Sequence, residues 1–322
     1  MKAIQVSKVG GPEVLELVDI PTPEPKPNEV LVQIKAAGVN FIDVYYREGQ
    51  YPAPLLFILG QEGAGVVGTI GSEVSNVKPG DRVAYTGVLG SYAEVAAVPA
   101  DRLVQIPEKL DFNQAAAAML QGMTAHYLSH STFPIKTGQT VLIHAAAGGV
   151  GLLLVQMAKK LGARVIGTAG SDEKAKLARD AGADELIIYT KQDFEKETLR
   201  LTENKGVDVV YDGVGKTTFE KDLKVLGPRG YLVLFGGASG AVPPFDLMLL
   251  TKHGSLFVTR PSLPHYIGTR AELEQRSSEV LQMIVSGDLK LRIHKAYPLS
   301  QAPEAHRDLE GRNTSGKLLL IP

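Results

Sequence analysis

The sequence predicts an α/β protein in two parts: a strand-rich barrel or sandwich and a doubly wound parallel sheet. Three observations support this prediction. The chain has 322 residues, about twice the commonest domain size, so two domains are expected. The first 110 residues contain short alternating segments, and from Asn113 onwards strand-like and helix-like segments follow each other in turn.

Short strands account for the first part. Alternating or β-branched segments are separated by turns rich in Pro, Gly, Asn and Asp, and no long helical pattern intervenes. Such close spacing is typical of an antiparallel barrel or sandwich. The expected strands are 15–20, 29–39, 64–70, 81–87 and 91–98.

The second part begins with a predicted helix over 113–130 and then alternates between strands and helices. This alternation favours a doubly wound parallel sheet. The expected strands are 140–144, 163–170, 185–189, 207–215, 230–237 and 255–260, with helices over 148–162 and 171–183, and then a helix over 271–287 and a strand over 316–322.

Composition excludes several classes of protein. Lys and Arg number 34 against 35 Asp and Glu, so no basic field points to nucleic acid. The absence of cysteine excludes disulfides, thiolate zinc and a cysteine nucleophile. The apolar stretch from Thr140 to Ala158 is long enough for a membrane span, but Gly148-Gly149 breaks it, so no span is expected. The opening residues contain no apolar signal core, which favours the cytoplasm.

A glycine-rich loop follows the predicted strand 140–144 and leads directly into a helix. Against the pattern G-x-G-x-x-G, its three key positions are Ala146, Gly148 and Gly151. A glycine in the middle lets the backbone touch a pyrophosphate, and the helix amino end supplies N–H groups and positive charge. Residues Ala147, Gly148, Gly149, Val150 and Gly151 are therefore predicted to bind a dinucleotide. The alternative is a turn that serves only strand–helix packing.

The next strand indicates which dinucleotide binds. An NAD site usually has an acidic residue near its end that holds the ribose 2′-hydroxyl. Here the strand ends at Gly167–Ser171, and no acid occurs before Asp172. Ser171 and Lys174 could instead meet a 2′-phosphate, which favours NADPH/NADP. The alternative is that Lys174 is only a solvated helix charge.

Four motifs carry a resemblance that covers essentially the whole chain. With these motifs, the chain resembles the medium-chain dehydrogenase/reductase superfamily, and most closely its zinc-free, ζ-crystallin-like quinone oxidoreductases. The resemblance implies a GroES-like β-barrel domain (1–118 and 260–322), a Rossmann NADP-binding domain (119–259), an active site in the cleft between them and a homodimer. The motifs are 36–43 (AAGVNFID), 59–65 (LGQEGAG), 77–83 (VKPGDRV) and 145–151 (AAAGGVG).

The resemblance also implies roles for single residues. Asn40, Gln61 and Thr124 would contact the nicotinamide part of the cofactor. Tyr45 and Tyr51 would present an aromatic wall to a flat quinone, although both could simply pack under a loop. The remaining implied contacts are Lys174, Tyr189 and Arg312 at the 2′-phosphate, Phe235, Gly236 and Ser239 at the riboses, and Phe257 and Val258 at the carboxamide.

Zinc is not expected in this chain. Where zinc-dependent relatives place a cysteine and a histidine ligand, the sequence has Asn40 and Gln61, and no histidine precedes His126. Thiolate and imidazole are the usual zinc ligands. Without such a Lewis acid, reduction of an electrophilic acceptor is more feasible than alcohol oxidation.

The sequence therefore predicts a zinc-independent NADPH:quinone reductase acting on small aromatic quinones, by one-electron or hydride transfer. No residue stands out as the general acid. One alternative is an NADPH-dependent alkenal or enone double-bond reductase on the same scaffold. Another is a non-catalytic, crystallin-like NADPH-binding protein.

Overall fold

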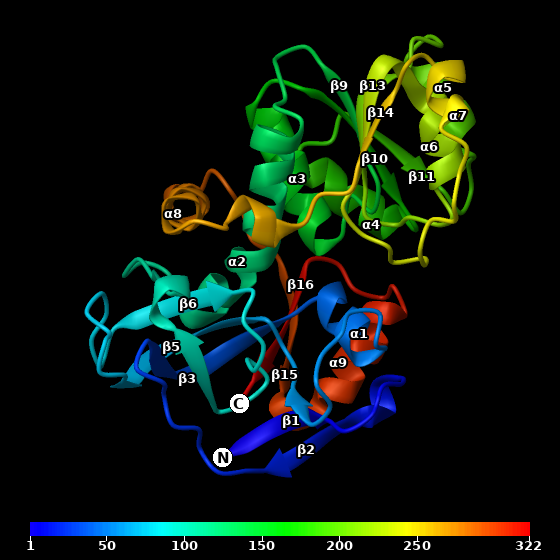
Figure 1. Ribbon diagram of the computed structural model, residues 1–322. Coiled ribbons are helices and arrows are strands. Elements are labelled where there is room, and N and C mark those ends of the chain that lie inside the picture. Colours follow the sequence, from blue (N-terminus) through cyan, green and yellow to red (C-terminus); the bar gives the residue numbers. More distant parts are fainter. The chain divides into compact units, whose positions relative to one another are not determined.

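The computed structural model describes residues 1–322, which divide into two compact units. Unit 1 contains Met1–Met123 and Ile267–Pro322, and unit 2 contains Thr124–Tyr266. Both boundaries lie a few residues later in the sequence than those expected above. Figure 1 shows the two units, which are described separately below.

Unit 1 is built mainly from strands. Its larger sheet has the order β15-β16-β3-β5-β6-β8, with β7 also paired to β3, and its smaller sheet has the order β2-β1-β4. All pairings are antiparallel except that of β15 with β16. The strands are β1 (Lys2–Val6), β2 (Leu15–Asp19), β3 (Glu29–Val39), β4 (Phe57–Ile58), β5 (Glu62–Ile70), β6 (Arg82–Thr86), β7 (Val95–Pro99), β8 (Val104–Gln105), β15 (Ile293–Pro298) and β16 (Lys317–Ile321).

Strand β3 holds this unit together because it pairs with β5, β7 and β16. Its inward side chains, such as Val30, Val32 and Ile34, join one apolar core with residues from both chain segments. Strand β16 lies between β15 and β3, so the larger sheet combines strands from both segments of unit 1.

Three α-helices belong entirely to unit 1: α1 (Phe41–Arg47), α8 (Arg270–Ser286) and α9 (Ala302–Glu310). The boundary between the units falls within α2 (Phe112–Tyr127). Helix α8 has clear start and stop signals. Thr269 and Glu272 form a capping box at its amino end, and Gly287 ends it with a φ of 83°.

Unit 2 contains a six-stranded sheet in the order β11-β10-β9-β12-β13-β14, and every pairing is parallel. This order, 3-2-1-4-5-6 in sequence numbering within the unit, is that of the doubly wound dinucleotide-binding fold and confirms the predicted fold class. The strands are β9 (Thr140–Ile143), β10 (Arg164–Ala169), β11 (Glu185–Ile188), β12 (Val207–Asp212), β13 (Leu226–Leu234) and β14 (Phe257–Thr259).

Helices cover both faces of this sheet, with α3 on one side and α5 and α6 on the other in Figure 1. The apolar side chains of Leu142, Ile166, Val210 and Leu232 form the centre of one core beneath them. No helix of the chain has both the length and the apolar character needed to cross a membrane. The helices are α3 (Gly149–Lys160), α4 (Asp172–Asp180), α5 (Phe194–Leu201), α6 (Phe219–Val225) and α7 (Met248–Lys252).

The close approach of β3 and β5 requires a glycine at position 65. A Cβ on Gly65 would lie 2.0 Å from the Gln33 carbonyl oxygen, whereas a Cβ on Gly68 in the same strand would meet nothing nearer than 3.5 Å. We expect Gly65→Ala to lower the free energy of unfolding by about 1–3 kcal/mol. The matched variant Gly68→Ala should change it by less than about 0.5 kcal/mol. Urea denaturation of both variants measures this, and equal losses would contradict the packing described here.

Candidate active site

The glycine-rich segment Ala145–Gly151, here called the dinucleotide loop, leaves the carboxyl end of β9 and runs into α3. Strand β9 lies next to β10 on one side and β12 on the other, so the loop is at the point where the strand order reverses. Ligands of parallel sheets bind outside the carboxyl ends of the strands at this point.

The loop fits a pyrophosphate group. Gly148 precedes α3 in an extended conformation, and no side chain caps the helix. The first N–H groups of α3 are therefore open to an anion. A Cβ on Gly151 would lie 2.3 Å from the Ala145 carbonyl oxygen, so only glycine permits this tight turn.

The end of β10 carries the residues predicted to select NADPH. The Ser171 hydroxyl caps α4 by accepting a hydrogen bond from the Lys174 N–H at 3.3 Å. The Lys174 side chain is half-buried in the first turn of α4. Asp172, the nearest acid, forms an ion pair with Lys191 at 2.5 Å, which lowers its pKa. A cation and a hydroxyl at this strand end suit a 2′-phosphate better than a ribose 2′-hydroxyl.

Other predicted cofactor contacts of unit 2 also lie near the carboxyl ends of its strands. Tyr189 follows β11 and is 46% exposed, with its hydroxyl against Gly170. Phe235, Gly236 and Ser239 follow β13, and the Ser239 hydroxyl donates to the Val214 carbonyl oxygen at 2.8 Å. In addition, Thr124 is buried in α2, and Phe257 and Val258 belong to β14.

In unit 1, Asn40 belongs to a buried polar cluster with Glu62, Lys317 and Gln121, here called the Asn40 cluster. The Asn40 Nδ2 donates to Glu62 Oε2 at 2.9 Å, and its Oδ1 accepts from Lys317 Nζ at 2.7 Å. Lys317 and Glu62 form an ion pair whose two side chains are almost completely buried. Both ends of the Asn40 amide are therefore held by other side chains of unit 1.

The backbone is shaped around the Asn40 cluster. A Cβ on Gly38 would lie 2.0 Å from Glu62 Oε2, so the cluster needs a glycine there. The other carboxylate oxygen of Glu62 accepts a hydrogen bond from the Leu120 N–H of α2 at 2.6 Å. Gln61, the neighbour of Glu62, is also buried. One carboxylate thus connects β5, β16 and α2 around Asn40.

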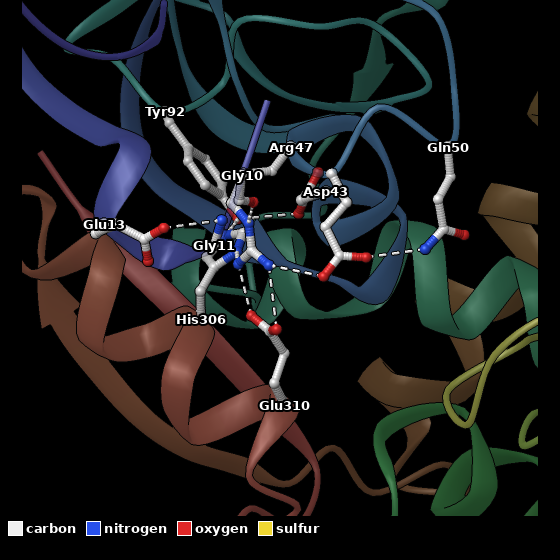
Figure 2. A network of polar contacts seen from close by, with 10 residues as sticks. Gly10, Gly11, Glu13, Asp43, Arg47, Gln50, Tyr92, His306 and Glu310 are labelled. Atoms are coloured by element: carbon white, nitrogen blue, oxygen red, sulfur yellow. Dashed lines mark hydrogen bonds and ion pairs between the residues drawn. The ribbon is translucent and has the colours of Figure 1, made fainter. Parts of the chain in front are cut away.

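Figure 2 shows a second buried system, here called the Arg47 network. It contains Asp43, Arg47, Tyr92, His306 and Glu310. Arg47 is completely buried and binds Glu310 at 2.5 Å and His306 Nδ1 at 3.1 Å. The network reaches the Asn40 cluster through Asp43, whose Oδ2 accepts from the Asn40 N–H at 2.9 Å.

The direction of the hydrogen bonds in the Arg47 network follows from its chemistry. A guanidinium can only donate, so Nδ1 of His306 accepts and Nε2 carries the proton. That N–H donates to the Tyr92 hydroxyl at 3.2 Å, and the hydroxyl donates to Asp43 Oδ2 at 2.9 Å. Burial and the Arg47 charge lower the pKa of His306 to about 3, so the ring stays neutral. Burial raises the pKa of Asp43 to about 7.

Tyr45 and Tyr51 are brought together near the Arg47 network. Their rings meet edge to face with centroids 5.7 Å apart, and Tyr46 packs on Tyr51 in the same way at 5.5 Å. Tyr51 is 37% exposed, so this aromatic group has one open side. Arg312 is exposed and has a φ of 56°.

Sequence reasoning missed most members of the two buried systems. Glu62 and Asp43 stand inside motifs that were recognised, but their partners are far away in the chain. Lys317 offers the clearest missed signal, because a lysine at the start of an apolar strand needs a buried partner. His306 and Arg47 are 259 positions apart, and no local pattern joins them.

Unit 2 has a parallel sheet with an uncapped glycine loop, and unit 1 is rich in strands. Together these features define a dinucleotide-dependent oxidoreductase of two domains. Family models agree with this class. Residues 26–108 match the alcohol dehydrogenase GroES-like domain, and residues 149–280 match the zinc-binding dehydrogenase family.

Full-length relatives narrow the class. A quinone oxidoreductase of Pseudomonas aeruginosa is 49% identical, over 100% of this chain and 99% of the relative. The crystal structure of Escherichia coli quinone oxidoreductase complexed with NADPH superimposes with a TM-score of 0.98 at 46% identity, covering 100% of both chains. A 2-haloacrylate reductase of a Burkholderia species is 40% identical over 99% of this chain and 98% of the relative. The chain belongs to the quinone oxidoreductase family of the medium-chain dehydrogenase/reductase superfamily.

The zinc that gives one family model its description does not fit this chain. No thiolate is possible because the sequence lacks cysteine, and no three His, Asp or Glu side chains group as ligands. The Lys317 ammonium beside Asn40 Oδ1 would also repel a divalent cation. The residues at these positions therefore do not form a zinc site of the usual kind.

The raised pKa of Asp43 predicts a pH dependence of stability. Folded Asp43 keeps its proton up to about pH 7, but unfolded Asp43 loses it near pH 4. Between these values the folded state binds the extra proton, so this residue makes stability fall as the pH rises. In Asp43→Asn the free energy of unfolding, relative to the unmodified protein, should therefore rise by about 1.4 kcal/mol per pH unit.

Urea denaturation of both proteins between pH 4.5 and 6.5 measures this difference. The opposing contribution of His306 is present in both proteins and cancels in the comparison. Asp19→Asn makes the same change at a side chain that is 80% exposed and should give no such rise. Parallel pH profiles for Asp43→Asn and the unmodified protein would contradict a protonated Asp43.

Proposed function

We propose that this protein reduces quinones with NADPH. The observation that carries the proposal is the dinucleotide loop, open at the amino end of α3, in a chain whose whole length matches the NADPH-complexed quinone oxidoreductase of Escherichia coli. Two features at the end of β10 support the proposal. Lys174 and Ser171 lie there together, and the nearest acid, Asp172, is paired with Lys191.

NADPH, when bound, supplies the hydride equivalent for the reduction. The N–H groups of Ala147, Gly149, Val150 and Gly151 would hold the pyrophosphate, and Gly148, without a side chain, would let it approach closely. Ser171, Lys174, Tyr189 and Arg312 would hold the 2′-phosphate. The other proposed contacts are Asn40, Gln61 and Thr124 at the nicotinamide, Phe235, Gly236 and Ser239 at the riboses, and the backbone of Phe257 and Val258 at the carboxamide.

On the substrate side, we propose that the chain acts mainly by positioning. Tyr45 and Tyr51 offer aromatic surface on which a flat quinone ring can stack. Asn40 is fixed by Lys317 and Glu62, so it contributes a rigid wall. A quinone tolerates the lack of a general acid, because its reduced oxygens can take protons from water. Holding the acceptor at roughly 3–3.5 Å from the hydride donor can supply much of the rate.

Reduction of an activated carbon–carbon double bond is a second candidate. The 40% identity to a 2-haloacrylate reductase over nearly the whole chain favours it. This reaction needs more than positioning, since a developing enolate requires stabilisation and later a proton at carbon. Tyr92, the only hydroxyl of the Arg47 network, is completely buried, and it is already committed to Asp43. We therefore place double-bond reduction second.

We also propose a homodimer. Strand β14 pairs with β13 on one side only, and the Phe257 side chain on it is 49% exposed. An open edge strand with an exposed aromatic side chain favours pairing with a second copy. A cytoplasmic location is proposed as well.

The proposed choice of NADPH over NADH can be tested at α4. Lys174→Ala should weaken NADPH binding by roughly ten- to a hundredfold, because a charge-assisted contact with the 2′-phosphate is lost. NADH, which lacks this phosphate, should bind as before. The matched variant Lys176→Ala removes an exposed lysine of the same helix that pairs with Asp180, and it should affect neither cofactor. Isothermal titration calorimetry gives both dissociation constants, and equal losses for NADH and NADPH in Lys174→Ala would refute the assignment.

The two candidate reactions differ in substrate preference. We expect kcat/KM for ortho- and para-quinones to exceed that for simple 2-alkenals, since only the alkenals need a proton delivered to carbon. Tyr51→Phe should reduce quinone turnover less than about tenfold, below the usual effect of a general acid of roughly 10²–10⁴. NADPH oxidation followed at 340 nm measures both. Faster turnover of alkenals, or a hundredfold loss in Tyr51→Phe, would move the assignment to double-bond reduction.

A further inference from the structure

A third buried polar group lies beneath the dinucleotide loop and has no part in the function proposed so far. It consists of His144, Thr168 and Asp222, here called the His144 bridge. All three side chains are almost completely buried. His144 directly follows β9, Thr168 belongs to β10 and Asp222 belongs to α6, so three parts of unit 2 meet at one imidazole ring.

Both nitrogens of the His144 ring have partners. Nε2 lies 2.7 Å from Asp222 Oδ1, and Nδ1 lies 3.0 Å from the Thr168 hydroxyl. Phe194 packs edge to face on the ring with centroids 4.7 Å apart. Burial alone would lower the pKa of His144, but the Asp222 carboxylate more than compensates and raises it. The ring is therefore fixed in position by contacts on three sides.

The Thr168 hydroxyl connects this ring to the loop. It accepts a hydrogen bond from the Ala145 N–H at 3.3 Å, and the Thr168 carbonyl oxygen accepts one from the Ala146 N–H at 3.0 Å. Because the hydroxyl accepts from Ala145, its own proton can point to His144 Nδ1. Nε2 of His144 then carries the ring proton toward Asp222. The first two N–H groups of the loop are thus hydrogen-bonded to Thr168, and the Thr168 hydroxyl is hydrogen-bonded to His144.

Ala145 is the residue that most needs this support. Its φ is 50°, in the left-handed region that a residue with a Cβ adopts only at a cost. The Ala145 carbonyl oxygen accepts from the Gly148 N–H at 2.8 Å and faces the space above Gly151. The conformation of Ala145 therefore sets the path of the loop up to the amino end of α3.

We propose that His144 is a positioning residue for the cofactor: through Thr168 it fixes Ala145, and so aims the N–H groups of the dinucleotide loop at the pyrophosphate. This inference rests on the proposed binding of NADPH at the loop. In this proposal His144 contacts neither the cofactor nor the substrate. Changes at His144 or Thr168 should therefore affect only the binding of the pyrophosphate part of the ligand.

The test compares two ligands and two variants of one residue. NADPH carries a pyrophosphate, whereas 2′-AMP has the adenine and 2′-phosphate but no pyrophosphate. Thr168→Val keeps the side-chain shape and removes the hydroxyl. We expect it to weaken NADPH binding about five- to twentyfold, as the loss of one or two hydrogen bonds predicts. Binding of 2′-AMP should stay within twofold. Thr168→Ser restores the hydroxyl and should restore NADPH affinity.

His144→Gln extends the test to the ring itself, and its NADPH affinity should fall as in Thr168→Val while 2′-AMP binds normally. Isothermal titration calorimetry measures the affinities, and the 2′-AMP arm shows that each variant is folded. Equal weakening of both ligands, unchanged NADPH affinity, or no recovery in Thr168→Ser would overturn the inference. If the unmodified protein binds 2′-AMP and NADPH equally weakly, the proposed use of the loop fails instead, and the two failures are distinguishable.

Discussion

The buried ion pair between Lys317 and Glu62 is the contact on which the rest of the site in unit 1 depends. Unit 1 is made from two segments of chain, and β16 must dock between β15 and β3 to complete its sheet. Lys317 begins that strand and brings its charge into the core, where Glu62 neutralises it. Breaking a buried pair leaves one charge unpaired and costs about 3–5 kcal/mol. Docking of β16 and the fixing of the Asn40 side chain therefore depend on the same contact.

The same physical constraint applies to both units. A backbone segment whose outer side is left for a ligand can be held only by buried side chains on its inner side. In unit 1 the Asn40 cluster and the Arg47 network do this for Asn40 and for helix α1. In unit 2 the His144 bridge does it for the dinucleotide loop. Each system places buried charged or polar groups, each with a partner, beneath a segment that is proposed to face a ligand.

Much of the fold could be predicted from the sequence because its strands and longer helices follow local residue patterns. The alternation of strands and helices predicted the parallel sheet of unit 2, and the glycine spacing predicted the loop at Gly148–Gly151. Among the short helices that were not predicted are α1 (Phe41–Arg47) and α9 (Ala302–Glu310), since they contain too few turns to show a clear period. Yet they carry Arg47 and His306, and their contacts depend on tertiary structure alone.

The site residues divide in the same way. Ser171 and Lys174 could be predicted as cofactor contacts because one turn of chain links them to a strand end. His144 stands next to a recognised loop, but its importance depends on Asp222, 78 positions further on. No local pattern in a single sequence identifies the distant partners of such a residue. The buried polar systems beneath the loops are thus the part of the site that only the structure reveals.

A crystal structure of this protein with NADPH tests the central claim most directly. The account predicts the pyrophosphate on the N–H groups of Gly149–Gly151, with the 2′-phosphate against Lys174 and Ser171 at the start of α4. It also predicts that Ala145 keeps its left-handed conformation and its contact with Thr168. A pyrophosphate bound elsewhere, or a 2′-phosphate turned away from α4, would contradict the account.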